Sequence, residues 1–486
     1  MSGEGRGPAR GRRGGGRRGG ARPPRVSPAR LVAAEVLRAV RESDAYANLL
    51  LPTRIARAAL GEADAGLATE LTYGTLRMSG YYDRVIAIAA GRPVAEIDPV
   101  VLDVLRLGVH QLLATRVPTH AALHESVDLV RIMGAPAASG FVNGVLRGVS
   151  RVSADAWRER VREHAFDEDD ARAALTSHPA WVVRALRRAL DREGRAGELD
   201  DLLAADNLPP AVNYAVLGGV DAVGPADLGE PDRFSPIGFT AGGGDPAAAL
   251  AGHDGRVRVQ DEGSQLAALA LARARPVRAG ERWLDLCAGP GGKTAVLAAE
   301  ARAGGAVLEA NEVVPARAEL VRRALAGVDD GVRVHERDGR ELGDDRAGAF
   351  DRILLDAPCT GLGALRRRPE ARWRKTPDDV GELTALQAEL VDSAVAALAP
   401  GGVLAYVTCS PHLAETRTIV QQALRRHDDL ERADVHAVLD EVAQHPLDLA
   451  GEAGEAQLWP HRHGCDAMFI ALLAKRDPEA SVGSQA

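Results

Sequence analysis

The chain has 486 residues, of which 46% are hydrophobic and 3% aromatic, and its formal net charge is −8. This length predicts two or three domains. Four cysteines are too few for a disulfide framework, so we expect a protein of the reducing cytoplasm. No apolar run approaches the roughly 18 residues that cross a bilayer, and the twin arginines near the start lack the apolar segment of a secretory signal.

Residues 1–27 are rich in Gly, Arg and Pro, and we expect them to be a disordered tail. The first thirty residues hold nine arginines and a single acid, Glu4, so the remaining chain carries a net charge of about −16. The tail is either a non-specific RNA-binding arm of the Arg-Gly type or a variable extension without a function. An acidic body with local basic segments favours a protein that holds nucleic acid at defined places.

Helical periodicity dominates residues 28–150. Apolar residues at helical spacing, such as Leu31, Val36 and Val40, recur in successive segments up to Ile132 without strand-like alternation. The spacing predicts an all-α domain over 28–150. Residues 151–255 begin as charged helical segments and become rich in Pro and Gly, which predicts a helical linker followed by a small α/β connector.

From residue 256 to residue 476, strand-like runs alternate with helical stretches. The expected strands cover 283–287, 307–310, 332–335, 352–355 and 403–407. Thr376 followed by Pro377 and two aspartates marks the start of one helix. This alternation predicts a parallel, doubly wound Rossmann-like sheet that binds its ligands at the carboxyl edge of the strands. We expect residues 477–486 to form a second disordered tail.

A glycine-rich turn follows the first of these strands, in Asp285-Leu-Cys-Ala-Gly289-Pro-Gly-Gly-Lys293-Thr. Glu312 follows the second strand, where a carboxylate can bind ribose hydroxyls, and Asp338 follows the third, where it can reach an adenine amino group. The glycine spacing differs from the G-x-G-x-x-G of NAD sites, and Cys287 stands where a phosphate-binding loop needs glycine. S-adenosylmethionine, an adenosine ligand without phosphates, fits these residues best.

Two cysteines follow the last two predicted strands. Cys359 ends the run Asp356-Ala-Pro-Cys, and Cys409 lies in Thr-Cys-Ser. A thiolate that adds to C6 of cytosine makes C5 nucleophilic towards a methyl sulfonium, and Asp356 could hold the N3/N4 edge of the base. Cys287 is expected to pack as a small hydrophobe. Cys465 lies near two histidines without the paired spacings of a zinc site, so we predict no metal.

A basic stretch lies directly after Cys359. It contains a tryptophan among five arginines, and only Glu370 opposes its charge. Its position predicts an RNA-binding segment that grips phosphates and bases. The residues expected to contact RNA are Arg366, Arg367, Arg368, Arg372, Trp373 and Arg374.

These motifs are similar to those of a known family. Residues 284–294, Asp356–Cys359 with the Arg-rich stretch that follows, and Thr408–Ser410 resemble the RNA 5-methylcytosine methyltransferases of the Sun/Fmu (NOL1/NOP2/Sun) family. The N-terminal segment, through residues 29–30, 45–48 and 141–147, is similar to the NusB RNA-binding fold. The combination resembles the bacterial members that methylate a cytosine of 16S ribosomal RNA, and the resemblance covers about residues 28–476.

The resemblance implies that Cys409 is the nucleophile that attacks C6 and that Cys359 assists proton removal and product release. DNA cytosine methyltransferases use the Pro-Cys thiol instead, so this assignment rests on the family. The family usually has Asp at the ribose position, where this chain has Glu312, and Glu309 is a possible substitute. The cofactor contacts implied are Cys287, Ala288, Gly289, Pro290, Gly291, Gly292, Lys293, Glu312, Arg317, Asp338 and Asp356.

The expected activity is therefore cytosine-C5 methylation of 16S rRNA with S-adenosyl-L-methionine. We expect the partner to be unassembled or partly assembled small-subunit RNA, and the protein to be a monomer with no membrane association. Two alternatives remain open at this point. One is a ribosome-assembly factor that binds rRNA without catalysis, and the other is a DNA cytosine-C5 methyltransferase.

Overall fold

The structure, a computed structural model, describes residues 25–43, 45–218, 228–244 and 246–478. The tails expected at 1–27 and 477–486 lie largely outside these ranges. Residues 25–27 are described and are held by the protein, because the backbone N–H groups of Arg25 and Ser27 donate to Asp128 and Glu125 at 3.0 and 2.8 Å. Within the described ranges, no helix has the length and apolarity that crossing a membrane requires.

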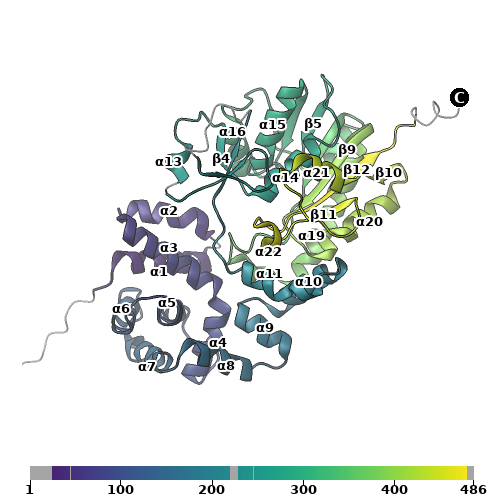
Figure 1. The fold of residues 1–486 in the computed structure, drawn as a ribbon. Helices are drawn as coiled ribbons and strands as arrows, with labels where there is room; N and C mark the ends of the chain where they lie inside the picture. The colour runs from purple at the N-terminus through teal and green to yellow at the C-terminus, as the bar shows by residue number, and fades with distance from the viewer. Residues whose placement is uncertain (1–24, 44, 219–227, 245, 479–486) are drawn as a thin grey trace, which may run out of the picture.

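The N-terminal part is all-α, as predicted (Figure 1). Its apolar faces meet in one core that includes Leu105 and Leu146. Asp98 caps the central helix by accepting from the N–H groups of Val100 and Val101, and Pro99 opens that helix. The helices are α1 Pro28–Glu42, α2 Ala47–Arg57, α3 Glu62–Arg77, α4 Ser79–Ala90, α5 Pro99–Ala114, α6 Thr119–Ile132, α7 Ser139–Ser150 and α8 Ala154–Glu163, with short 3-10 turns at Val94–Glu96 and Pro136–Ala138.

The linker helices divide between the two neighbouring cores, so core membership does not change at residue 150. Trp157 of α8 and Leu175 of α9 pack in the N-terminal core, whereas Leu186 of α10 and Leu203 of α11 pack with Trp459 near the C-terminus. Figure 1 shows α10 and α11 between the N-terminal helices and the larger sheet. Their bounds are α9 Glu168–Thr176, α10 Ala180–Arg192, a 3-10 turn at Ala196–Glu198, and α11 Leu199–Ala205.

The predicted small connector is a four-stranded antiparallel sheet in the order β2-β3-β1-β4. Its strands are β1 Asn213–Val216, β2 Glu230–Pro231, β3 Gly238–Thr240 and β4 Val257–Val259, with the short helix α13 Pro246–Leu250. Strand β4 lies beyond the predicted boundary at 255, so this sheet extends into the segment that we expected to begin the catalytic domain.

The C-terminal part is built on an eight-stranded sheet in the order β10-β12-β9-β8-β5-β6-β7, with β11 paired to β12. Five neighbouring strands of this sheet, β9, β8, β5, β6 and β7, are parallel to one another. The expectation of a wholly parallel sheet is corrected by β12, which runs antiparallel to β9, β10 and β11. The strands are β5 Arg282–Asp285, β6 Val307–Asn311, β7 Arg333–His335, β8 Phe350–Asp356, β9 Leu398–Thr408, β10 Leu430–Arg432, β11 Glu455–Gln457 and β12 Phe469–Lys475.

Helices cover both faces of this sheet, which makes the three-layer arrangement of a Rossmann-like fold (Figure 1). Apolar residues of α14, α15, α16 and α21 share one core, and those of α17, α19 and α20 share the other. Thr376 and Asp379 form the capping box that starts α19, as the sequence predicts. The helices are α14 Glu262–Ala272, α15 Gly292–Gly304, α16 Pro315–Leu325, α17 Leu342–Asp345, α18 Ala371–Arg374, α19 Pro377–Ala397, α20 Arg417–Arg426, α21 Val435–Val442 and α22 Pro460–His463, with 3-10 turns at Gly339–Glu341 and Leu413–Glu415.

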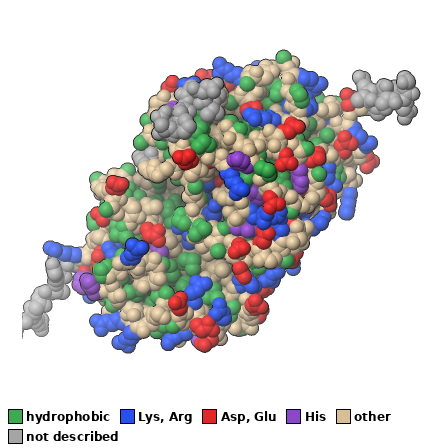
Figure 2. All heavy atoms as spheres, viewed as in Figure 1, with side chains coloured by type: hydrophobic (Ala, Val, Ile, Leu, Met, Phe, Trp, Pro, Cys, Tyr) green, Lys and Arg blue, Asp and Glu red, His purple; other side chains and the backbone are tan. Residues whose placement is uncertain are grey.

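Charged side chains are mixed over the surface. Figure 2 shows Lys and Arg side chains interspersed with Asp and Glu side chains over the face in view, rather than gathered in one basic patch. On this face a nucleic acid would therefore meet both signs of charge, and its placement would depend on a local site.

Candidate active site

A pocket of about 530 Å³ opens at the carboxyl edge of the parallel strands. Strand β5 has β6 on one side and β8 on the other, so the connections change direction beside it. Ligands of open α/β sheets bind at this switch point. The pocket is lined by residues of the loops that follow β5, β6, β7, β8 and β9, and by Tyr46 of the N-terminal domain.

The glycine turn after β5 is closely packed against the next strand end. The N–H of Gly289 donates to Glu312 at 3.0 Å, and a Cβ at Gly289 would lie 2.2 Å from the same carboxylate oxygen. Gly291 has φ 104° and opens α15. Both positions therefore require glycine, one for a close approach and the other for its backbone conformation.

Asp285 lies beneath this turn with almost no exposed surface. One of its carboxylate oxygens accepts from the hydroxyl of Thr294 at 2.7 Å, and the other has no hydrogen-bond partner among the described residues. Burial raises the pKa of Asp285 to about 7, with the charge of Asp356 adding to the rise and the Thr294 bond opposing it. Asp285 is thus a buried carboxyl beneath the turn and does not itself line the pocket.

The acids after β6 and β7 also lie on this edge, as predicted. Glu312 accepts from the N–H groups of Gly289 and Val314, each at 3.0 Å, and forms an ion pair with Arg317. Arg317 in turn donates to the carbonyl of Gly289 at 2.6 Å. Asp338 accepts from Arg340 and is partly exposed, and this hydrogen bond lowers the pKa of Asp338. Both acids line the pocket and keep acceptor capacity for a ligand.

The two predicted thiols meet across the ends of β8 and β9. The sulfur atoms of Cys359 and Cys409 are 3.5 Å apart, and both residues line the pocket. The pKa of Cys359 is raised well above its ordinary value, first by the bond to Cys409 and then by burial and by the charges of Glu415 and Asp356. At neutral pH Cys359 is therefore a thiol that can donate towards the sulfur of Cys409.

A cation lies close to the thiol pair. Lys293 donates to Asp356 at 2.7 Å. Burial lowers the pKa of Lys293, but Asp356 and the neighbouring Cys409 outweigh burial and raise it. The ammonium group is therefore charged. The ammonium group of Lys293 therefore interacts with both the carboxylate of Asp356 and the side chain of Cys409.

The sequence gives little sign of the residue that holds the two thiol loops together. Glu415 is fully buried and accepts from the N–H and hydroxyl of Thr360 at 2.7 and 2.5 Å, and from the hydroxyl of Ser410 at 2.6 Å. Thr360 and Ser410 each follow one of the cysteines directly. A single carboxylate therefore connects both thiol loops. The only sequence signal is an acid five residues after Ser410, which is also typical of an exposed loop.

The basic stretch after Cys359 does not have the arrangement that the sequence predicts. Arg372 has no exposed surface and donates to the carbonyl of Ser177 and the side chain of Asn207, both at 2.9 Å. Arg366 is buried and donates to the carbonyl of Gly464. The expectation that Arg366 and Arg372 contact RNA is not met in this structure, because both guanidinium groups are occupied by protein oxygens.

The rest of the stretch is also largely engaged by the protein. Arg367 pairs with Asp261 and Asp466, and Arg374 donates to two carbonyls of the N-terminal domain. Trp373 is 44% exposed, and its ring lies so close to Gly80 that a Cβ there would be 2.3 Å away. Arg368 is exposed and lines the pocket. Much of the stretch therefore joins domains, and Arg368 remains free to face a substrate.

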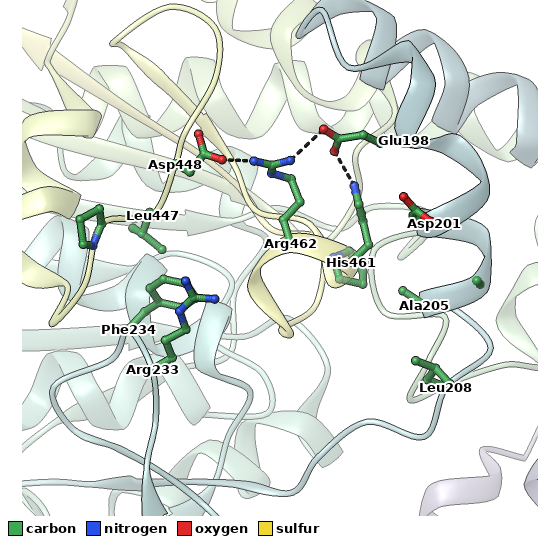
Figure 3. A pocket seen from close by; sticks show the side chains of 13 residues that line it. Glu198, Asp201, Ala205, Leu208, Arg233, Phe234, Leu447, Asp448, His461 and Arg462 are labelled. Atoms are coloured by element: carbon green, nitrogen blue, oxygen red, sulfur yellow. Dashed lines mark hydrogen bonds and ion pairs between the residues drawn. The ribbon is translucent and has the colours of Figure 1, made fainter.

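A second pocket, of about 700 Å³, lies away from the thiols, between α11, α22 and the loop at 446–448 (Figure 3). Its charged groups bind one another. Arg462 pairs with Glu198 and Asp448, and the Nε2–H of His461 donates to Glu198 at 2.8 Å. These contacts join the linker to the C-terminal segment. Near them Cys465 is buried in the core, and in the described ranges no group of three His, Cys, Asp or Glu side chains is arranged to hold a metal ion.

The residues at the carboxyl edge fit S-adenosylmethionine. Glu312 lies where a ribose can bind, and Asp338 lines the pocket together with the apolar side chains of Leu286 and Leu390, where an adenine ring can lie. The fold and this site define a Rossmann-like, S-adenosylmethionine-dependent methyltransferase.

Comparison with known proteins gives the family. A sequence profile described as 16S rRNA methyltransferase RsmB/F matches residues 273–474, and a profile of the NusB family matches residues 27–151. The chain belongs to the RsmB/F methyltransferase family. It is 47% identical over 452 residues to Rv1407, a protein of Mycobacterium tuberculosis named as a methyltransferase, with 92% of this chain and 96% of the relative covered.

Other relatives span nearly the same length. Identity is 31% over 465 residues to the ribosomal RNA small subunit methyltransferase B of Erwinia tasmaniensis, covering 92% of this chain and 98% of the relative. The crystal structure of PH0851 superposes with a TM-score of 0.75 at 23% identity, covering 93% of this chain and 99% of the other, which supports the fold.

Proposed function

We propose that this protein transfers a methyl group from S-adenosylmethionine to C5 of a cytosine in 16S rRNA, through a covalent bond between Cys409 and C6 of the base. The observation that carries the proposal is the 3.5 Å separation of the two thiols on the wall of the pocket that contains the cofactor-fitting acids. The names of the relatives point to small-subunit rRNA as the substrate.

The charges around the thiols favour Cys409 as the nucleophile. Lys293 is charged and interacts with Cys409. Cys359 has a raised pKa and carboxylates as neighbours, which favour its protonated form. Addition of the Cys409 thiolate to C6 pushes the electron pair of the C5–C6 double bond to C5. Asp356, oriented by Lys293, can accept from the N3/N4 edge of the base and stabilise the protonated adduct.

S-adenosylmethionine supplies the electrophilic methyl group when it is bound. Once C5 carries the methyl group, a base such as a water molecule in the open pocket takes the C5 proton, the C–H electron pair re-forms the C5–C6 double bond, and Cys409 leaves as a thiolate. Cys359 is placed to assist this second stage, because its sulfur is within hydrogen-bond distance of Cys409. The two thiols thus divide the reaction into bond formation and product release.

The test uses 16S rRNA transcripts that carry tritium at C5 of cytosine. The wild-type protein should release tritium and form 5-methylcytidine. Cys409→Ala should release none, whereas Cys359→Ala should accumulate a protein–RNA adduct that survives denaturing electrophoresis. Cys465→Ala, a change at a buried cysteine away from the pocket, is the control for the loss of a thiol. Tritium release by a folded Cys409→Ala protein would refute the nucleophile, and methylation of DNA in place of RNA would refute the substrate.

A further inference from the structure

The N-terminal domain contributes one aromatic side chain to the catalytic pocket. Tyr46 immediately precedes α2, lines the same pocket as Cys359 and Cys409, and is 42% exposed. The ring therefore keeps exposed apolar surface on the wall of the pocket that contains the thiols, where a ligand can cover it.

The backbone on both sides of Tyr46 is fixed to the basic stretch of the catalytic domain. Arg374 donates to the carbonyl of Ala45 at 2.7 Å and to that of Val40 at 2.9 Å. The N–H of Ala47 donates to Glu370 at 3.3 Å. These bonds connect two domains across more than 320 residues of sequence, so Tyr46 is held at the pocket by the interface itself.

Two cations flank the ring. The guanidinium carbons of Arg368 and Arg374 lie 5.0 and 5.3 Å from its centroid, within the range of a cation–π interaction. Arg368 is also exposed and lines the pocket. A partly exposed aromatic ring with an exposed arginine over it can bind an unpaired nucleotide when the arginine turns towards the phosphate, because a base then stacks on the ring and the cation attracts the phosphate.

The residues in contact with Tyr46 and its neighbours come from a different segment than the residues that fit the cofactor. Arg368, Glu370 and Arg374 follow Cys359 in the chain, whereas the ribose and adenine positions are built from the loops after β5, β6 and β7. A base that reaches the thiols must leave the RNA stack, so its neighbours in the strand lie near the same pocket, which Tyr46 also lines.

We propose that Tyr46 is a substrate-positioning residue that stacks on an unpaired nucleotide next to the target cytosine, while Arg368 binds the adjoining phosphate. The inference rests on the proposed function and adds to it that the N-terminal domain forms part of the substrate site. The ligand class is single-stranded RNA, or RNA opened at the target position.

The test compares Tyr46→Ala, Tyr46→Phe and the wild-type full-length protein. The RNA carries 2-aminopurine on either side of the target cytosine, so that stacking quenches its fluorescence. The wild-type protein and Tyr46→Phe should quench, and Tyr46→Ala should not. Loss of one stacking contact should raise KM for RNA by roughly tenfold or more, with kcat nearly unchanged and the Kd for S-adenosylmethionine unaltered. Phe166→Ala, at a 93% exposed aromatic residue outside the pocket, is the matched control.

The outcomes separate this inference from the proposed function. If Tyr46→Ala is folded and keeps the wild-type KM and quenching, the stacking role is refuted while C5 methylation stands. An equal loss of S-adenosylmethionine affinity would also refute it, because the ring would then serve the cofactor. If the wild-type protein labels an atom other than cytosine C5 but the quenching difference persists, the proposed chemistry is refuted and the nucleotide-binding role of Tyr46 is supported.

Discussion

Glu415 accepts a hydrogen bond from Ser410 at 2.6 Å, and with the same carboxylate it holds Thr360. Ser410 and Thr360 directly follow Cys409 and Cys359, so this carboxylate fixes the distance between the two sulfur atoms. Thiol geometry in this protein is thus set by a buried side chain that the substrate does not reach.

We expect Glu415→Ala to lower kcat by about 100-fold, because misplacement of a reacting group by about 1 Å has an effect of that size. KM for RNA should change little. Glu415→Gln should recover much of the loss, because the amide can accept from the Thr360 N–H while the two hydroxyls reverse their bonds. Steady-state kinetics on folded protein give the result. Glu281→Ala removes another buried carboxylate away from the thiols and should reduce stability without this loss of kcat.

Gly289→Ala should weaken S-adenosylmethionine binding by tenfold or more. The added Cβ would lie 2.2 Å from Glu312 and 2.8 Å from Arg317, so both side chains must move from the ribose position. Isothermal titration calorimetry measures the change. Gly381→Ala is the control, because a Cβ there meets nothing within 4 Å. Wild-type affinity in Gly289→Ala would show that Glu312 does not bind the cofactor.

Arg368→Ala and Arg372→Ala should fail in different ways. Arg372 is buried among protein oxygens, so its loss should reduce the free energy of unfolding by about 3–5 kcal/mol. Arg368 is exposed at the pocket, so its loss should leave stability unchanged and weaken RNA binding. In Arg368→Ala the slope of log RNA affinity against log salt concentration should decrease in magnitude by about one, which corresponds to one lost phosphate contact. Chemical denaturation and RNA titrations at several salt concentrations distinguish the two. A reduced salt slope in a stable Arg372→Ala protein would contradict the buried role.

Asp285 should make stability fall as pH rises from about 4 to about 7. The pKa of this carboxyl is raised by burial from its ordinary value of 3.8 to about 7. Between these values the native protein keeps a proton that the unfolded chain has lost, so the native state is favoured at the acidic end, and the effect levels off above about 7. The resulting decrease in the free energy of unfolding amounts to about 4 kcal/mol at most.

Urea unfolding of the wild-type protein and Asp285→Asn across this range isolates the effect, because other groups titrate in both proteins. The difference in unfolding free energy between them should shift in favour of the variant as pH rises. A difference that is constant with pH would show that Asp285 ionises normally in the native protein.

Much of the carboxyl edge is predictable from the sequence. Parallel strands that are buried on both faces are continuous apolar runs, and the functional residue stands where each run ends, as Asp356 does at the end of β8 and Glu312 directly after β6. The N-terminal cap of α19 at Thr376 can also be predicted from the sequence. Local patterns are sufficient here because the backbone alone brings strand ends together.

Other features depend on tertiary packing. The apolar run of residues 469–474 within β12 does not show by its pattern whether it is a strand, or in which direction it would pair. The sequence around Arg366, Arg372 and Arg374 would be the same whether these arginines bind phosphates or backbone carbonyls, so it does not reveal their partners. Trp157 packs in the N-terminal core although it lies beyond the predicted end of that domain. Side-chain partners, rather than local propensity, decide these cases.

The contacts of Arg372 and Arg374 have a consequence for how a transcript is received. They join α18, which follows Cys359, to the linker and to the N-terminal helices, so these bodies cannot swing apart without uncovering buried cations. We therefore expect the RNA-binding site to be preformed. Any opening of the RNA helix around the target nucleotide should then be a change in the RNA and not a hinge motion between these domains.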